Sequence, residues 1–157
     1  MIPEYALNEW RNTVRWGGLE QTEQDLVICR ALVELFNDDY LSSHLAFRGD
    51  TALHKLYLSP QPRYSEDIDL VQIDPEPIKE TINRITQVLS FISEPVIKQK
   101  ANNNTLIFRF ESEIQPVVPL KLKVEFLGDI NMLLRIGEQY DPQQAFIVVK
   151  KVLLDKL

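Results

Sequence analysis

Apolar residues recur at two spacings along the chain, and the spacing separates expected helices from expected strands. From residue 22 to residue 37 they recur every three or four positions, which predicts a core-facing helix that begins with a capping box at residues 22–25. Its expected core face consists of Leu26, Cys29, Leu32, Val33 and Phe36. A second amphipathic helix is expected from Pro77 to Ile92, after a proline-rich turn.

Shorter apolar runs, several with strict alternation, predict strands. They cover residues 45–48, 67–71, 96–100, 106–110, 120–127 and 146–149. Gly49 ends the first run, and a helix is expected at 51–57, so this segment should form a strand, a tight turn and a helix. The asparagines at 102–104 predict a hairpin, and residues 150–157 predict the start of a further helix.

Composition limits the class of protein. The chain has 157 residues, of which 45% are hydrophobic and 25% charged, which suits a single globular domain of the α+β class. It contains neither a run of about 18 apolar residues nor a signal-peptide pattern, so a soluble cytoplasmic protein without membrane contact is expected. The net charge of −6 argues against broad binding to nucleic-acid phosphates, but it leaves a local basic groove open.

Cysteine and histidine offer little chemistry in this sequence. Cys29 is the single cysteine, which excludes an intramolecular disulfide, and its apolar surroundings favour burial in a helix. His44 and His54 have no second histidine or cysteine at ligand spacing, so we expect structural roles and no zinc site.

Carboxylates on expected strands are the strongest chemical signal. Asp67 and Asp69 lie two residues apart on one strand, so both should project from the same face, about 6 to 7 Å apart at the backbone. Two like charges so close require a cation, and oxygen ligands suit a hard divalent ion. Glu125, on the polar side of another strand, would add a third carboxylate if that strand is a neighbour, as in two-metal phosphoryl-transfer sites.

Each of these signals also has an ordinary structural explanation. A lone Asp-x-Asp is usually a solvated strand face, and Gly49 taken alone indicates only a turn. Glu125 between Lys121 and Lys123 fits an exposed, charge-balanced strand face better than a ligand position when it is considered alone.

The order of the motifs adds a family resemblance. The sequence Phe47-Arg48-Gly49-Asp50-Thr51-Ala52-Leu53-His54-Lys55-Leu56-Tyr57, followed by Arg63-Tyr64-Ser65-Glu66-Asp67-Ile68-Asp69-Leu70, resembles the AbiEii/AbiGii toxin nucleotidyltransferases. Their pattern is roughly F-x-G-G-T-A-L-x-K-x-Y, a short loop, and R-x-S-x-D-[IL]-D-[LF]. The family belongs to the DNA polymerase β-like nucleotidyltransferase superfamily, so the resemblance implies a small mixed β-sheet flanked by helices.

The resemblance also implies roles for individual residues. Asp67, Asp69 and Glu125 would be catalytic and would hold Mg²⁺, with two ions as one option. The residues expected to bind the nucleoside triphosphate are Gly49, Thr51, Lys55, Arg63, Ser65 and Lys156. The activity would be transfer of an NMP from an NTP to an RNA (tRNA) or protein acceptor, by the toxin of a toxin–antitoxin or abortive-infection system with a cognate antitoxin.

Two departures from the family pattern leave an alternative open. Asp50 stands where the family has its second glycine, which puts a carboxylate where phosphate would approach. The family generally continues into a helical region with another acidic motif, so residues 1–157 are expected to form a core domain without that region. The alternative is a catalytically inactive remnant of the fold that binds a nucleotide or a partner.

Overall fold

The architecture is that of a computed structural model, which describes residues 2–14, 16–58, 60–100 and 103–127. Its helices are α1 (Glu4–Thr13), α2 (Leu19–Asn37), α3 (Asp39–His44), α4 (Gly49–Leu56) and α5 (Ile78–Val88). Its strands are β1 (Leu45–Arg48), β2 (Asp67–Gln72), β3 (Val96–Lys100), β4 (Asn103–Glu111) and β5 (Pro119–Leu127). Within the described residues, no helix is long and apolar enough to cross a membrane.

The five strands form one mixed sheet in the order β1-β2-β5-β4-β3. Strands β2 and β5 pair in parallel, whereas the other neighbours are antiparallel. The predicted α+β class with a small mixed sheet is therefore confirmed. The parallel pair joins segments that lie 56 residues apart in the sequence, as in the partners Asp67 and Lys123, so it brings the Asp-x-Asp strand beside the strand of Glu125.

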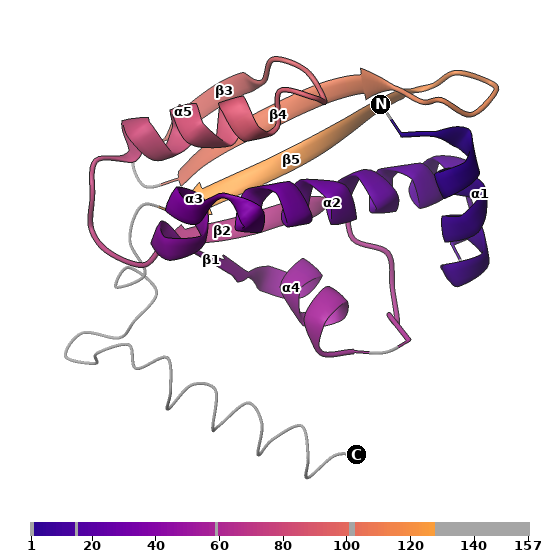
Figure 1. Cartoon of the computed structure of the whole chain (residues 1–157), viewed down its shortest axis with the longest axis horizontal. Helices are drawn as coiled ribbons and strands as arrows, with labels where there is room; N and C mark the ends of the chain where they lie inside the picture. Colours follow the sequence, from indigo (N-terminus) through magenta and orange to yellow (C-terminus); the bar gives the residue numbers. More distant parts are fainter. Residues whose placement is uncertain (1, 15, 59, 101–102, 128–157) are drawn as a thin grey trace, which may run out of the picture.

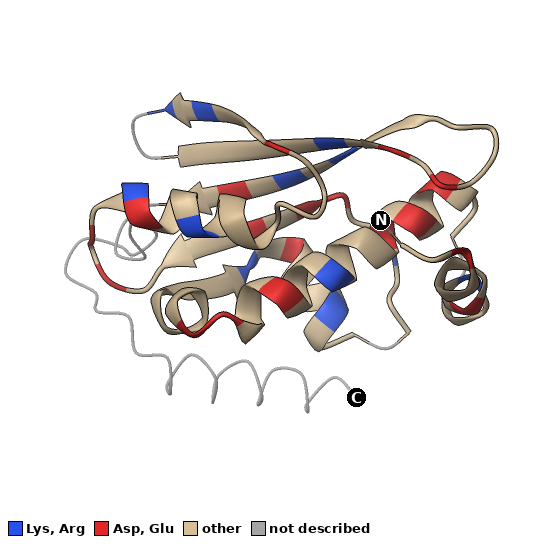
Figure 2. Ribbon diagram, turned by 45° about the horizontal axis from the view of Figure 1, so that its top comes forward, with Lys and Arg blue, Asp and Glu red and all other residues tan. Residues whose placement is uncertain are grey.

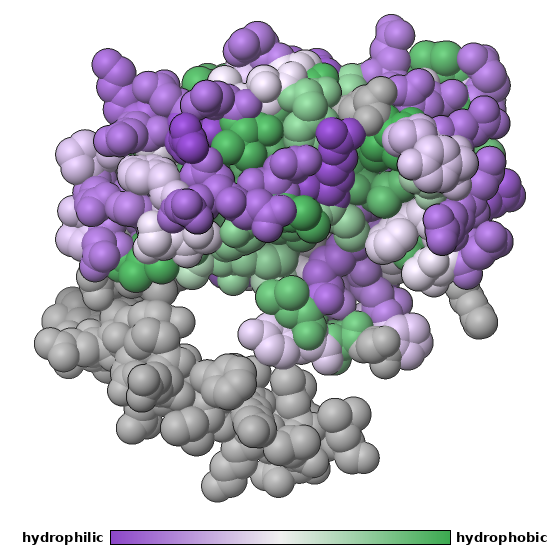
Figure 3. Space-filling model, viewed as in Figure 1, coloured by the Kyte–Doolittle hydropathy of each residue, from purple (hydrophilic) through white to green (hydrophobic). Residues whose placement is uncertain are grey.

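Helices α2 and α5 pack side by side over one face of the sheet, as Figure 1 shows. That face carries the core, because every second residue of the three central strands is fully buried there. These residues include Ile68, Leu70, Leu106, Phe108, Leu122, Val124 and Phe126. The surface seen in Figure 3, on the side of α2 and α5, is largely hydrophilic, with smaller apolar areas between the polar side chains.

Helix α2 differs from the sequence-based prediction in both its start and its buried face. It begins at Leu19, where Gln21 Oε1 accepts a hydrogen bond from the Gly18 N–H at 3.1 Å, so the predicted capping box at residues 22–25 is wrong. The fully buried apolar residues are Val27, Ile28, Ala31 and Leu35. The most buried face runs through Gln24, Ile28, Ala31 and Leu35. Val33 lies on the opposite side of the helix and is 59% exposed, whereas Leu26, Leu32 and Phe36 are partly buried against the core.

The remaining elements largely follow the pattern of apolar positions. The strands predicted at 45–48, 67–71, 96–100, 106–110 and 120–127 are confirmed, with β4 beginning earlier, at Asn103. Helix α4 begins at Gly49 instead of residue 51, and α5 ends at Val88 instead of Ile92. Helices α1 and α3 were not predicted. The strand predicted at 146–149, the helix at 150–157 and the candidate Lys156 lie outside the described residues.

Candidate functional site

The two aspartates of β2 lie on the sheet face opposite the core. Ile68 and Leu70 between and after them are fully buried, so strand alternation turns Asp67 and Asp69 to the other side, where both are half-buried. On the neighbouring parallel strand, Lys123 is the register partner of Asp67, and Glu125 is the register partner of Asp69. Four charged side chains thus occupy two adjacent rows of one face.

The turn between β1 and α4 brings a further carboxylate to this face. Gly49 has a φ of +78°, and a Cβ at this position would lie 2.2 Å from Oδ2 of Asp69. Both facts require glycine, because a side chain would be strained and would collide with the aspartate. The close packing of the turn on Asp69 brings Asp50 to the cluster, and Asp50, Asp67 and Asp69 each offer an oxygen within 4.8 Å of the others.

Two basic side chains pair with the carboxylates from different sides. Arg63, from the loop before β2, forms an ion pair with Asp50 and is 61% exposed. The ammonium of Lys123 lies 2.7 Å from Oε1 of Glu125 and 3.7 Å from Oδ2 of Asp67. Figure 2 shows acidic and basic residues on neighbouring strands of the sheet. Glu125 is therefore beside the aspartates, but its carboxylate is held by a lysine.

The hydroxyl groups of Thr51 and Ser65 connect the start of α4 to the strand that carries Asp67 and Asp69. Thr51 Oγ1 donates to the backbone oxygen of Asp67 at 2.7 Å, and it is also hydrogen bonded to Ser65 Oγ. A carbonyl can only accept, so the Thr51 proton goes to Asp67, and Ser65 must donate to Thr51. Both side chains are buried, at 0% and 4% exposure, and they tie the start of α4 to the start of β2.

Lys55 is directed toward α2. Its ammonium lies 2.5 Å from Oδ1 of Asp25, whose side chain is fully buried, and the Trp10 indole N–H donates to the other oxygen of Asp25 at 3.0 Å. The Lys55 side chain is only 10% exposed. In the described conformation this predicted nucleotide ligand joins α4 to α2 through a buried ion pair.

The electrostatics of the site reflect an excess of carboxylates. Burial and the charge of Asp67 raise the pKa of Asp69 above its ordinary value of 3.8, and Glu125 adds to this effect, while Arg48 and Lys123 oppose it. The hydrogen bond to Glu125 raises the pKa of Lys123. The site therefore disfavours the ionised form of Asp69, and a bound cation would remove this electrostatic penalty.

The donor set fits a hard divalent cation. Carboxylate oxygens are the ligands that Mg²⁺ prefers, and it takes them together with water or phosphate oxygens at about 2.0–2.1 Å. Asp50, Asp67 and Asp69 would hold such an ion, which would supply the charge that polarises a phosphate group. The half-buried position leaves the cluster open to a ligand from solvent.

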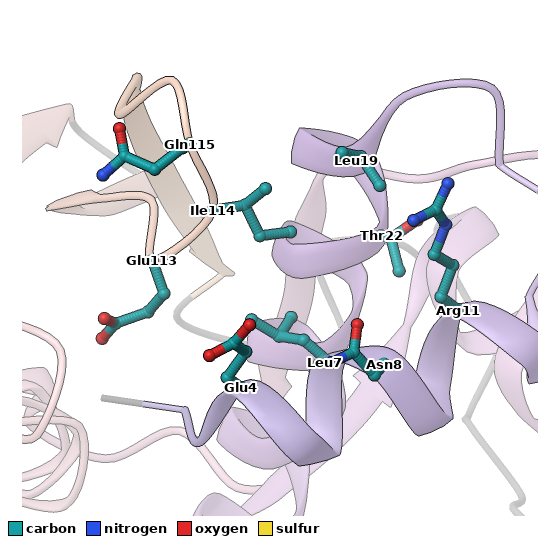
Figure 4. A pocket seen from close by; sticks show the side chains of 9 residues that line it. All are labelled: Glu4, Leu7, Asn8, Arg11, Leu19, Thr22, Glu113, Ile114 and Gln115. Carbon is teal, nitrogen blue, oxygen red and sulfur yellow. The ribbon is translucent and has the colours of Figure 1, made fainter.

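A separate cavity of about 300 Å³ lies elsewhere, between α1, the first turn of α2 and the segment after β4. Figure 4 shows the side chains that line it: Glu4, Leu7, Asn8, Arg11, Leu19, Thr22, Glu113, Ile114 and Gln115. None of these residues belongs to the carboxylate cluster, so the cavity adds nothing to its chemistry.

Sequence reasoning missed three residues of this arrangement. It treated Asp50 only as a departure that weakens phosphate binding, although a carboxylate just after Gly49 would be expected near Asp69 once β1 is paired with β2. Lys123 stands two positions before Glu125, and this spacing on a strand already put both on one face. Asp25 had no such signal, because its partner lies 30 residues away on another helix.

A family comparison decides the assignment. The family described as "Nucleotidyl transferase AbiEii toxin, Type IV TA system" matches residues 30–141, which include the Gly49 turn and all four carboxylates. The chain belongs to the AbiEii nucleotidyltransferase toxin family. The predicted resemblance is thereby confirmed. No curated protein matches the chain.

Solved structures give a more distant likeness to this AbiEii chain. JHP933 from Helicobacter pylori is 19% identical with a TM-score of 0.48, and the match covers 81% of this chain and 45% of that one. MenT4, a nucleotidyltransferase toxin from Mycobacterium tuberculosis, is 18% identical with a TM-score of 0.49, and the match covers 82% and 44% of the two chains. The chain spans less than half the length of these structures.

Proposed function

We propose that this AbiEii chain is a metal-dependent nucleotidyltransferase that transfers an NMP from an NTP to an acceptor, with Asp67, Asp69 and Glu125 as its catalytic carboxylates. The observation that carries the proposal is the convergence of Asp50, Asp67 and Asp69 beside the Gly49 turn, within a domain of this family. Mg²⁺ at these carboxylates would bind the triphosphate and stabilise the charge of the leaving pyrophosphate.

The protein's contribution to the reaction is mainly positioning. The Gly49 turn packs on Asp69, and the Thr51 hydroxyl fixes the backbone of Asp67, so the two aspartates are held before a ligand arrives. Arg63 is exposed beside the cluster, where its guanidinium would meet phosphate oxygens after leaving Asp50. The proposed nucleotide site therefore comprises the Gly49 turn, Thr51, Ser65 and Arg63, with Lys55 and Lys156 as further predicted contacts.

The acceptor and the biological setting are part of the same proposal. An RNA such as tRNA, or a protein, would receive the nucleotide at a hydroxyl group, and transfer in the bacterial cytoplasm would inhibit growth. A cognate antitoxin would restrain that inhibition. The family description, which names a type IV toxin–antitoxin system, supports this setting.

Label transfer from each of the four α-labelled NTPs to a tRNA pool and to cellular protein, with and without Mg²⁺, tests the activity. We expect metal-dependent labelling with at least one NTP, and its loss in Asp67→Asn, because the amide keeps the shape but removes a charged ligand. Asp74→Asn alters an exposed carboxylate just beyond β2 and serves as the matched control. Equal labelling by wild type and Asp67→Asn contradicts the proposed role.

One observation favours a second candidate function, a nucleotide- or partner-binding remnant without turnover. Asp50 stands where the family pattern has glycine, and it already forms an ion pair with Arg63. Nucleotide binding without label transfer from any NTP to either acceptor pool would favour this candidate.

A further inference from the structure

The four carboxylates of the site do not have equal access to a cation. Asp50, Asp67 and Asp69 form a triad with oxygens within 4.8 Å, whereas Glu125 is bound to the Lys123 ammonium at 2.7 Å. The same ammonium lies 3.7 Å from Asp67, so it stands between the strand of the aspartates and the strand of the glutamate. In two-metal sites the ions lie about 3.5–4 Å apart, so a second ion shared by Asp67 and Glu125 would need the place that this ammonium occupies.

We propose that this chain binds a single divalent ion, at Asp50, Asp67 and Asp69, and that the Lys123 ammonium takes the place of a second ion between Asp67 and Glu125. The inference rests on the proposed metal site and deepens it. It changes the expectation of two ions into one ion and one fixed organic cation.

The sheet register explains why Lys123 reaches this place. Lys123 and Glu125 are two residues apart on β5, so they share a face, and their register partners on β2 are the two aspartates. Lys123 is about one-third exposed, as are Asp67 and Glu125, so its charge is partly removed from water and is compensated by both carboxylates. A divalent ion bound to Glu125 would have to displace this ammonium or remain in repulsive contact with it.

Asp50 provides the third carboxylate of the proposed metal site. With Glu125 engaged by Lys123, β2 alone would offer two carboxylates, and Asp50 adds a third from the turn after β1. Its present partner, Arg63, is 61% exposed, so that ion pair is screened by solvent and is easily exchanged for a metal ion. The two cations therefore differ: Arg63 can yield to an ion, while Lys123 bridges two carboxylates.

Counting bound Mn²⁺ tests the inference, because the electron paramagnetic resonance signal of free Mn²⁺ falls as the ion binds. The whole chain is titrated with Mn²⁺ alone, and we expect one site per chain in wild type. Lys123→Met removes the ammonium but keeps an unbranched side chain, and we expect two sites per chain. Lys121 is on the same face of β5 but is exposed and is the register partner of Arg109, so Lys121→Met should leave one site with unchanged affinity.

The outcomes separate this inference from the proposed function. Two sites in wild type overturn the inference but support a metal-dependent transferase. One weak site that is identical in wild type and Lys123→Met also overturns the inference, provided that the circular dichroism spectrum and Tm show a folded variant. No Mn²⁺ binding by wild type overturns both the inference and the proposed metal site.

Discussion

Two groups of charged residues flank helix α4. They contain similar side chains, but one group holds the fold together and the other forms the candidate site. Between α2 and α4, Asp25 is fully buried, and both of its oxygens have partners, the Lys55 ammonium and the Trp10 indole. Beside the N-terminus of α4, four half-exposed carboxylates share the paired cations Arg63 and Lys123. In the first group every carboxylate oxygen has a hydrogen-bond partner. Among the described residues, the second group has four carboxylates and only these two paired cations, so it keeps an excess of negative charge.

The difference shows why identical residue types indicate structure in one place and chemistry in another. A buried ion pair with all its hydrogen bonds made has no capacity for a ligand, and losing one partner leaves an uncompensated charge. A partly solvated cluster with excess negative charge tolerates its own repulsion and gains from an added cation. Excess charge that the fold keeps accessible is therefore the better guide to the functional site.

The largest expected effect concerns the buried pair. Asp25→Ala leaves the Lys55 ammonium without its partner and should lower the free energy of unfolding by about 3–5 kcal/mol, as found when one member of a buried pair is removed. Urea denaturation measures this loss, and Asp74→Ala provides the exposed control. The double variant Asp25→Ala/Lys55→Met should lose less than the sum of the single changes. A loss below about 1 kcal/mol for Asp25→Ala would show that the pair is not structural.

The next largest effect concerns the Gly49 turn at the start of α4. Gly49→Ala places a Cβ against Asp69 and forces a positive φ on an L-residue, which costs about 1–2 kcal/mol from the backbone alone. Because the added carbon meets the Asp69 carboxylate, Mn²⁺ affinity should fall as well. Gly17→Ala is the matched control, since its nearest contact would be at 4.0 Å. Unchanged stability and unchanged Mn²⁺ affinity would refute the packing role of Gly49.

An ordinary carboxylate outside both groups gives a reference value. Asp38 caps α3 by accepting from the Leu41 N–H at 3.0 Å, and it also pairs with Arg84. Although burial opposes its ionisation, these contacts hold the pKa of Asp38 below 3.8. Asp38→Ala should cost about 1 kcal/mol at neutral pH. Since a lowered pKa stabilises the fold above the ordinary value, the Tm difference should shrink as the pH falls below 3.8; a constant difference argues against this linkage.

The smallest expected effect is a stabilisation, and it concerns Asp69 in the carboxylate cluster. The pKa of Asp69 is raised, so its ionisation above pH 3.8 destabilises the metal-free fold. Asp69→Asn should therefore raise Tm at pH 7 in EDTA, with a gain below about 1 kcal/mol because the site is partly solvated. The gain should vanish toward pH 3.8 and should reverse when Mn²⁺ stabilises wild type. A lower Tm in EDTA at pH 7 would contradict the excess-charge account.

Much of the fold could be predicted from local patterns, and the reasons for the failures are specific. Apolar and charged residues alternate along β5 because one face packs on α2 and the other carries charges, so the buried positions of this strand could be predicted. In α2, the polar residues Glu23 and Asp25 are fully buried by partners far along the chain, which no local period reveals. Helix α3 was missed because six residues after Asp38 are too short for a periodic signal.

Three of the four carboxylates of the candidate site were predictable from the sequence, whereas Asp50 and the partners of the lysines were not. Asp67 and Asp69 converge because strand alternation alone puts them on one face, and the parallel pairing with β5 brings Glu125 beside them. The partners of Lys55 and Lys123 depended on which strands and helices become neighbours, which is a property of the tertiary fold. Asp50 joins the cluster because of the positive φ at Gly49, which bends the chain toward Asp69.

Calorimetric titration of GTP, ATP, CTP and UTP into the protein with Mg²⁺ tests the central claim most directly, with the double variant Asp67→Asn/Asp69→Asn as the control. The account predicts binding of at least one NTP that requires Mg²⁺ and is lost in the folded double variant. Binding of equal strength without Mg²⁺ or in the double variant, or no binding of any NTP, would contradict a metal-dependent nucleotide site at these carboxylates.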